Sequence, residues 1–207
     1  MRIYSLFIKR LIDILVSLII LTLALPVFLL LTILLVIEYK GSPFFLQLRP
    51  GKNEKLFRVI KFRTMNDAKD AAGNLLSDGE RLTSVGRMIR KTSFDEIPQL
   101  INVIIGDMSL IGPRPLLIRY LPYYNDEERK RHTVRPGITG LAQVNGRNTV
   151  AWNERLAYDV VYVDNLSFFL DTKIFFLTVK NVISSKGIVI DPGSELENFD
   201  EQRKNYK

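Results

Sequence analysis

The longest apolar stretch of the 207-residue chain lies near its start. Residues 14–37 contain no charged side chain, and this length is typical of a helix in the hydrocarbon core of a bilayer. The stretch is longer than the apolar region of a signal peptide, and no cleavage site of small residues follows it. The pattern therefore predicts a membrane helix within residues 1–40.

Two topologies fit this helix: a single-pass anchor, and a re-entrant helix that enters and leaves by the same face. Basic residues flank it on both sides, from Lys9 and Arg10 to Lys40, so a spanning helix would leave one basic flank outside, against the positive-inside tendency. Pro26, near the middle, predicts a kink, with the Thr22 hydroxyl as a candidate partner for the freed backbone. From these residues alone the two topologies have about equal weight.

Beyond residue 40 the pattern changes to short elements. Residues 44–48 and 56–62 predict two strands around a turn with proline and glycine. Helices are expected over 82–90, 96–105, 126–132, 152–164 and 166–184, a loop or short helix over 64–80, a glycine-rich loop over 137–148 and a loose tail over 191–207. The expected fold class is α+β and mostly helical, with a membrane helix (1–40), one domain that could hold an active site (41–190) and a polar C-terminal tail (191–207).

Two expectations concern charges beside apolar faces. Asp13, three residues after Arg10, is expected to pair with it at the membrane interface. Residues 166–184 form a broad apolar face with their charged side chains outside it. Core packing is the more common explanation of such a face, and an amphipathic helix lying in the membrane interface is the alternative.

Composition narrows the chemistry. The net charge of +7 favours an anionic partner such as a nucleic acid, anionic lipid or a phosphorylated substrate. The chain has no cysteine and a single histidine, which excludes disulfides, thiolate metal sites and sites with several imidazoles. Any metal is therefore expected to be a hard cation on carboxylate oxygen, such as Mg2+. His132, beside Arg131 and Arg129, is expected at the surface or a helix end and not as a general base.

The adjacent acids Asp95 and Glu96 are the strongest candidates for catalysis. One interpretation is structural, because Ser93 and Glu96 fit a capping box at the start of a helix. The other is chemical: a carboxylate can attack phosphorus when cations, with Mg2+ as the usual bridge, cancel the repulsion between the two anions. The candidate cations are Lys61, Arg63, Arg87, Arg90, Arg114 and Arg147.

Arg114 stands between Pro113 and Pro115, and the two prolines fix the local backbone. This arrangement would orient the guanidinium for bidentate contact with phosphate, although a rigid surface turn also explains it. Arg147 lies in a sequence that also fits a plain turn, and residues 61–63 also fit a strand end with solvated charges.

Taken together, these motifs resemble the monotopic phosphoglycosyl transferases, the bacterial sugar transferase family that starts glycan assembly on polyprenyl phosphate. The similarity covers nearly the whole chain in order and corresponds to the family's minimal catalytic form. It is carried by the basic and apolar N-terminus and by Gln47-Leu-Arg49-Pro50-Gly51, Lys61-Phe-Arg63-Thr-Met, Asp95-Glu96-Ile-Pro98-Gln99, Gly106-Asp-Met-Ser-Leu-Ile-Gly-Pro113-Arg114-Pro115, Arg135-Pro-Gly137-Ile-Thr-Gly140, Gln143-Val-Asn-Gly-Arg147 and Tyr158-Asp159.

The resemblance implies a two-step reaction. Asp95 would attack the sugar-bearing phosphate of a UDP-sugar and expel UMP, and polyprenyl phosphate would then attack the phosphosugar–aspartate intermediate. Mg2+ would bind near Asp95, and Glu96 would assist metal binding or accept a proton. Contacts with phosphate or nucleotide are implied for Lys61, Arg63, Arg90, Arg114 and Arg147, and a polar active-site position for Asp159.

The resemblance also implies a location. The N-terminal helix would be re-entrant and broken at Pro26, amphipathic helices would lie in the interface, and the catalytic domain would face the cytoplasm at the bacterial inner membrane. The family often has a serine directly before this proline, whereas this chain has Leu25 at that position. The implied partners are UDP-sugar, undecaprenyl (polyprenyl) phosphate and membrane lipid, with no nucleic acid and with a homodimer left open.

Two alternatives compete with this account. In the first, phosphosugar moves in a single step and Asp95 serves only as a metal ligand. In the second, the chain is a non-catalytic basic module that binds anions from a membrane tether. Neither the sugar nor the glycan pathway is specified by the sequence.

Overall fold

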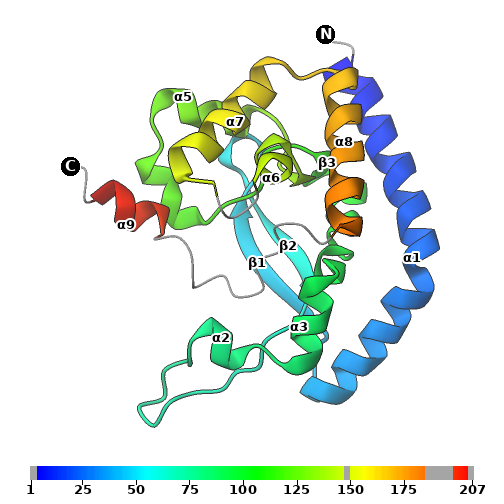
Figure 1. Ribbon diagram of the computed structural model, residues 1–207, viewed down its shortest axis with the longest axis vertical. Coiled ribbons are helices and arrows are strands. Elements are labelled where there is room, and N and C mark those ends of the chain that lie inside the picture. The colour runs from blue at the N-terminus through cyan, green and yellow to red at the C-terminus, as the bar shows by residue number, and fades with distance from the viewer. Residues whose placement is uncertain (1–3, 147–149, 185–197, 205–207) are drawn as a thin grey trace.

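The computed structural model describes residues 4–146, 150–184 and 198–204. Helix α1 (Lys9–Tyr39) follows a π-helical turn and leads into a hairpin of β1 (Phe44–Pro50) and β2 (Leu56–Phe62) at the centre of the domain (Figure 1). The further α-helices and strands are α2 (Asp78–Arg81), α3 (Ser84–Lys91), α4 (Gln99–Ile105), β3 (Ser109–Ile111), α5 (Asp126–Arg129), β4 (Gly137–Thr139), α6 (Leu141–Asn145), α7 (Trp152–Asp164), α8 (Phe168–Ile183) and α9 (Phe199–Lys204), and short 3-10 turns connect several of them. The prediction of a mostly helical chain with a short hairpin is confirmed.

The hairpin carries one wall of the site and is held by α4. Its strands pair antiparallel, with Gln47 opposite Val59. The Asn102 amide donates to the Arg58 carbonyl (2.8 Å) and accepts from the Ile60 N–H (2.9 Å). One buried side chain thus satisfies the backbone of the β2 edge and fixes α4 against it.

The glycine-rich segment 137–148 is not a loop throughout, because it contains β4 and α6. Strand β4 pairs in parallel with β3, a contact between segments that are far apart in sequence. A Cβ on Gly137 would lie 2.1 Å from the Gly112 nitrogen, so this glycine permits the close approach of two backbones. In the sequence these glycines indicated a loop, whereas the structure uses Gly137 for close backbone packing.

The N-terminal end of α1 is anchored to the domain, but not through the predicted pair. The Arg10 guanidinium donates to the carbonyls of Val103 and Ile104 at the C-terminal end of α4, where helix carbonyls lack partners. Asp13 is buried and accepts from the Leu110 N–H at 3.1 Å. The predicted Arg10–Asp13 ion pair is wrong, because each side chain satisfies backbone groups of the domain instead.

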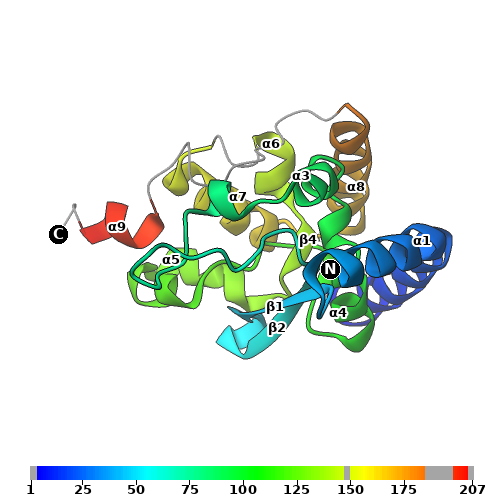
Figure 2. The same ribbon diagram turned by 90° about the horizontal axis from the view of Figure 1, so that it is seen from below.

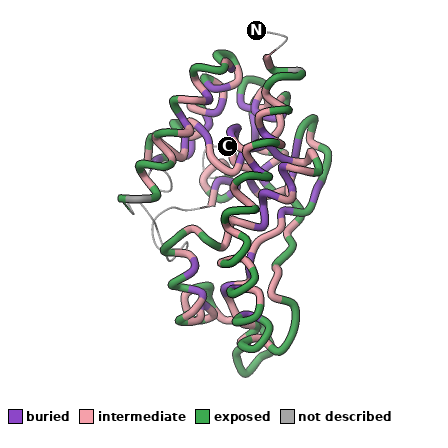
Figure 3. The backbone as a smooth tube through the Cα atoms, turned by 90° about the vertical axis from the view of Figure 1, so that its right-hand side faces the viewer, coloured by how far each residue is buried: buried purple, intermediate pink, exposed green. Residues whose placement is uncertain are grey.

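The other end of α1 also packs on the domain. Leu31 and Leu35 are buried with Phe62 and Ile89, whereas the middle of the helix exposes its apolar side chains, with Leu23 77% exposed. Figure 1 shows α1 bowing outward between its ends, and buried positions lie mainly inside the domain (Figure 3). The 31-residue helix is long and apolar enough to cross a membrane by length and composition.

Helix α8 lies beside the N-terminal half of α1 (Figures 1 and 2). Lys9 donates to Asp171 of α8 at 2.7 Å, and Ile174 is fully buried. Phe169 and Phe176, however, are 83% and 66% exposed. Core packing therefore accounts for one side of α8 and leaves an aromatic side uncovered in the described parts of the chain.

The C-terminal residues differ from the expected loose tail. Residues 198–204 include α9, whose Phe199 is fully buried against Tyr120, Tyr124 and Trp152. A single phenylalanine among polar residues gives little periodic signal, so the sequence pattern did not predict this packing.

Candidate active site

Asp95 and Glu96 lie in a single 3-10 turn (Phe94–Glu96) between α3 and α4. The predicted capping box is wrong: Ser93 adopts a left-handed conformation with φ of 59°, its side chain makes no capping bond, and α4 begins at Gln99. Positive φ is uncommon for a residue other than glycine and often marks a functional turn. The turn directs both carboxylates toward the hairpin.

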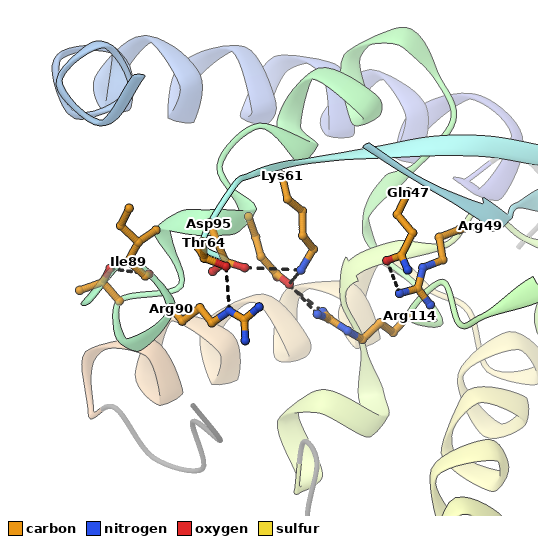
Figure 4. Close-up of polar contacts among 10 residues, drawn as sticks. Gln47, Arg49, Lys61, Thr64, Ile89, Arg90, Asp95 and Arg114 are labelled. Carbon is orange, nitrogen blue, oxygen red and sulfur yellow. Dashed lines mark hydrogen bonds and ion pairs between the residues drawn. The ribbon is translucent and has the colours of Figure 1, made fainter. Parts of the chain in front are cut away.

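Glu96 is held by two cations. Its Oε1 accepts from Lys61 Nζ at 2.7 Å and from Arg114 Nη2 at 2.5 Å (Figure 4). Burial opposes ionisation of Glu96, but the charges and hydrogen bonds of Arg114 and Lys61 prevail and hold its pKa well below the usual range. Glu96 is therefore a fixed anion that positions these cations.

Asp95 is held far more loosely. Its closest polar contact in the described parts of the chain is Lys61 Nζ at 3.5 Å from Oδ2. Burial, and then the neighbouring Glu96 charge, raise its pKa above the ordinary value, while Lys61, Arg114 and Arg90 oppose the rise. Glu96 thus has one oxygen, Oε1, held closely by two cations and the other, Oε2, 3.5 Å from Arg114 Nη1, whereas neither oxygen of Asp95 has a close cation partner in the described chain.

Arg90 faces the same turn from α3. Its Nε donates to Thr64 Oγ1 at 3.0 Å, and its Nη1 is buried with no partner among the residues that the structure describes (Figure 4). The packing that places it is tight, since a Cβ on Gly86 would lie 2.0 Å from the Thr64 carbonyl oxygen. A buried guanidinium N–H without a partner is a ready donor for an anion beside Asp95.

Arg63 lies outside this cluster. It pairs with exposed Asp67, donates to the Met65 carbonyl (3.2 Å) and stacks on the Tyr39 ring at 4.8 Å. The structure therefore separates Arg63 from Lys61. Alternation alone would put side chains two positions apart on the same face, but β2 ends at Phe62, so Arg63 no longer follows the strand.

Asp159 lies in a buried ion pair that supports the backbone near Arg114. It is 2% exposed and pairs with buried Arg131 at 2.9 Å. Arg131 in turn donates to Tyr124 Oη (3.0 Å) and to the backbone carbonyl of Arg114 (2.6 Å). The pair thus fixes the backbone that carries Arg114. The sequence interpretation missed Arg131, because residues 126–132 were predicted only as a charged helical stretch.

Arg147 lies outside the described residues. His132 was expected at the surface or at a helix end. It lies in a short 3-10 helix (Lys130–Thr133), but the structure buries it. Burial, and then the Arg131 charge, lower its pKa to about 4. The imidazole is therefore neutral near pH 7, and its packing on the Tyr124 ring accounts for its position.

A Mg2+ ion would fit beside Asp95. No group of three or more His, Asp or Glu side chains with metal-binding geometry occurs among the described residues, so a site built from protein ligands alone is not found there. Mg2+ commonly takes only one or two carboxylates and completes its shell with water and substrate phosphate. The loosely held Asp95 carboxylate matches that donor set, whereas the oxygens of Glu96 are engaged by cations.

Comparison with known proteins assigns the chain to a family. The model of the family described as "Bacterial sugar transferase" matches residues 4–185. The chain belongs to the bacterial sugar transferase family. Within it, the chain is 55% identical over 181 residues to the "Uncharacterized sugar transferase EpsL" of Bacillus subtilis (strain 168), with 87% of this chain and 89% of that protein covered.

Longer members of the family carry more specific names. The "UDP-glucose:undecaprenyl-phosphate glucose-1-phosphate transferase" of Klebsiella pneumoniae is 41% identical over 181 residues, which cover 83% of this chain and 39% of that protein. The "Undecaprenyl-phosphate galactose phosphotransferase" of Salmonella typhimurium is 38% identical over 205 residues, with 88% and 42% covered. The chain thus spans nearly all of EpsL and about two fifths of these longer relatives.

Proposed function

We propose that this sugar transferase moves a phosphosugar from a UDP-sugar to undecaprenyl phosphate through a phosphosugar–Asp95 intermediate. The observation that carries the proposal is the contrast between adjacent carboxylates. Glu96 is engaged by Lys61 and Arg114, while Asp95 has no hydrogen bond or ion pair shorter than 3.5 Å in the described chain and faces Arg90. One acid organises the cations, and the other is left to react.

In the first step an Asp95 oxygen forms a bond to the sugar-bearing phosphorus of the UDP-sugar. The bond from that phosphorus to the bridging oxygen breaks, and UMP leaves with the electron pair. In the second step a phosphate oxygen of undecaprenyl phosphate attacks the same phosphorus, and the Asp95 carboxylate leaves unchanged. The products are UMP and undecaprenyl-diphosphate-sugar.

The cations of the cluster lower the barrier by neutralising charge. Two anions must approach, so Lys61, Arg90 and Arg114 would stabilise the phosphoryl oxygens as charge spreads over them. Their positions are set before substrate arrives, because Glu96 holds two of them and Thr64 holds the third. Mg2+, bound by Asp95 and the diphosphate, would supply Lewis-acid stabilisation of the leaving phosphate.

The position of α1 supports a re-entrant topology. Arg10 and Asp13 anchor one end to α4 and β3, and Leu31 and Leu35 pack the other end on the same domain. A single-pass helix would place the bilayer between these two ends, which one domain on one face could not touch. The exposed apolar middle would therefore dip into the membrane and return at Pro26.

The uncovered side of α8 supports an interfacial position for the domain. Phe169 and Phe176 lie on the element beside α1, and phenylalanine with flanking lysine suits the boundary between headgroups and acyl chains. The basic flanks of α1 favour the cytoplasmic face of the bacterial inner membrane. The names of the relatives, which include undecaprenyl-phosphate transferases, are consistent with this location.

The test is an assay of UMP release and lipid product formation by purified protein with Mg2+ and undecaprenyl phosphate. The donors should include UDP-glucose, UDP-galactose and UDP-N-acetylgalactosamine, because the relatives differ in the sugar they are named for. The proposal predicts equal amounts of UMP and undecaprenyl-diphosphate-sugar with at least one UDP-sugar. Binding of UDP-sugars without turnover of any donor would contradict it and favour a non-catalytic module.

A further inference from the structure

One face of the hairpin lines a cavity beside the Phe94–Glu96 turn, which we name the catalytic turn after the role proposed above. Strand alternation and the register place Gln47, Arg49 and Lys61 on the same face of β1 and β2. These side chains form one wall of the cavity, and Arg114 stands in the opposite wall. Arg49 therefore opens onto the same space as two cations of the catalytic cluster.

Arg49 lacks a compensating charge. Its Nη2 donates to Gln47 Oε1 at 2.6 Å, a neutral partner, and no carboxylate of the described chain lies within ion-pair distance. Burial, and then the Arg114 charge, lower its pKa to about 10. A half-buried guanidinium next to a second cation is unfavourable until an anion binds between them.

A third guanidinium adds to this excess of positive charge. Arg155 stacks on Trp152 at 4.3 Å and donates to the Val150 carbonyl at 3.3 Å, and the Arg114 charge lowers its pKa after burial. Only Glu96 pairs with this group of arginines among the described residues. The surroundings of Arg114 are therefore built for a further anion.

We propose that Arg49, oriented by Gln47, forms with Arg114 a subsite for a phosphate monoester. The inference rests on the proposed function. In a double displacement at one phosphorus, the leaving UMP and the entering undecaprenyl phosphate both occupy the position opposite Asp95. Figure 4 shows Arg49 on the far side of Arg114 from Asp95, where such a group would lie. The same subsite would hold the phosphate of UMP as it leaves and that of the lipid as it enters.

The first arm of the test compares UMP with uridine, because the two differ only in the phosphate. Their dissociation constants would be measured by calorimetry on full-length protein in detergent with Mg2+, for wild type and Arg49→Gln. Loss of a charge-assisted hydrogen bond should reduce the preference for UMP over uridine by about 10-fold or more. Arg58→Gln is the matched control, since Arg58 is exposed on the opposite face of the same hairpin.

The second arm measures KM for undecaprenyl phosphate in the same variants. The KM should rise by a similar factor in Arg49→Gln. Arg49→Lys keeps the positive charge but loses the two-pronged guanidinium, so its KM should lie between those of wild type and Arg49→Gln. Equal melting temperatures would show that the variants fold.

A change in one arm only would overturn the shared subsite, and behaviour identical to Arg58→Gln would overturn any role of Arg49. Wild-type protein that neither binds UMP nor releases it would instead refute the proposed function itself.

Discussion

The molecule contains two clusters of acidic and basic side chains that differ in charge balance. In one, Asp159 and Arg131 form a buried pair whose remaining donors go to Tyr124 and the Arg114 backbone. In the other, the adjacent acids of the catalytic turn face more cations than they neutralise, and Asp95 is only loosely held. Balanced charge supports the structure, whereas unbalanced charge at a partly exposed turn is available for chemistry.

The same contrast separates the two acids within the catalytic turn. Glu96 resembles the balanced cluster, since Lys61 and Arg114 engage it, and the proposed mechanism assigns the reaction to the loosely held Asp95. Proximity in sequence therefore does not assign equal roles. The predictions below test whether charge balance separates support from catalysis, and they run from the largest expected effect to the smallest.

Asp95→Asn should reduce UMP release at least about 10³-fold, because an amide cannot act as the nucleophile. The remaining cations can still bind the UDP-sugar and stabilise its phosphates, but they cannot replace the attacking carboxylate. The measurement is the initial rate of UMP formation with saturating donor and acceptor. Asp164→Asn is the control, since Asp164 is an exposed acid near Lys130 at 3.7 Å. Activity within a few-fold of wild type in Asp95→Asn would remove Asp95 as the nucleophile.

Asp159→Asn should act first on stability. It leaves the buried Arg131 charge without its partner, and breaking a buried pair in this way costs about 3–5 kcal/mol in the free energy of unfolding. Thermal unfolding in detergent measures the loss, with Asp164→Asn again as the exposed control, where less than about 1 kcal/mol is expected. Unchanged stability together with lost activity would move Asp159 into the reacting site.

Glu96→Gln should lower kcat by roughly 10²-fold, because Lys61 and Arg114 lose the anion that positions them. It should also shift the pH profile. Catalysis needs ionised Asp95, so kcat/KM for the UDP-sugar falls as pH drops through its raised pKa. Removing the Glu96 charge lowers that pKa, and the acidic limb should move to lower pH. A limb that stays in place or moves to higher pH would refute the coupling between the two acids.

Arg63→Gln should have the smallest effect, a change of less than about 5-fold in KM for the donor, because its partner Asp67 is exposed and such pairs contribute little. Lys61→Gln, two positions earlier near the end of β2, is the informative comparison and should be far more damaging, since Lys61 contacts both acids. Similar losses in the two variants would place Arg63 in the substrate site.

Local signals in the sequence predicted much of the fold. The hairpin, α3, α7 and α8 follow from alternation and helical periodicity. Helix α4 ends at residue 105, as predicted, and Gly106 caps it in a left-handed conformation. The acids and most of the cations of the site could be found because their residue types and order are specific.

What the sequence did not reveal depends on contacts between distant segments. The parallel pairing of β3 with β4 joins segments too short for a periodic signal, and the burial of Phe199 depends on aromatic residues far away in the chain. The role of Arg131 required knowing that a charged stretch turns inward. The position of Arg49 had a usable signal, because alternation along β1 puts it on the face of Lys61 once the register is known.

The central claim is that Asp95 becomes covalently attached to the phosphosugar. The most direct test is to mix stoichiometric enzyme with the best UDP-sugar donor and Mg2+ in the absence of undecaprenyl phosphate, then follow UMP and the intact mass. The account predicts a burst approaching one UMP per active site and a phosphosugar adduct on the peptide that contains Asp95, which disappears when the lipid acceptor is added. UMP release that begins only after the acceptor is added, with no adduct at any time, would contradict it and establish single-step transfer.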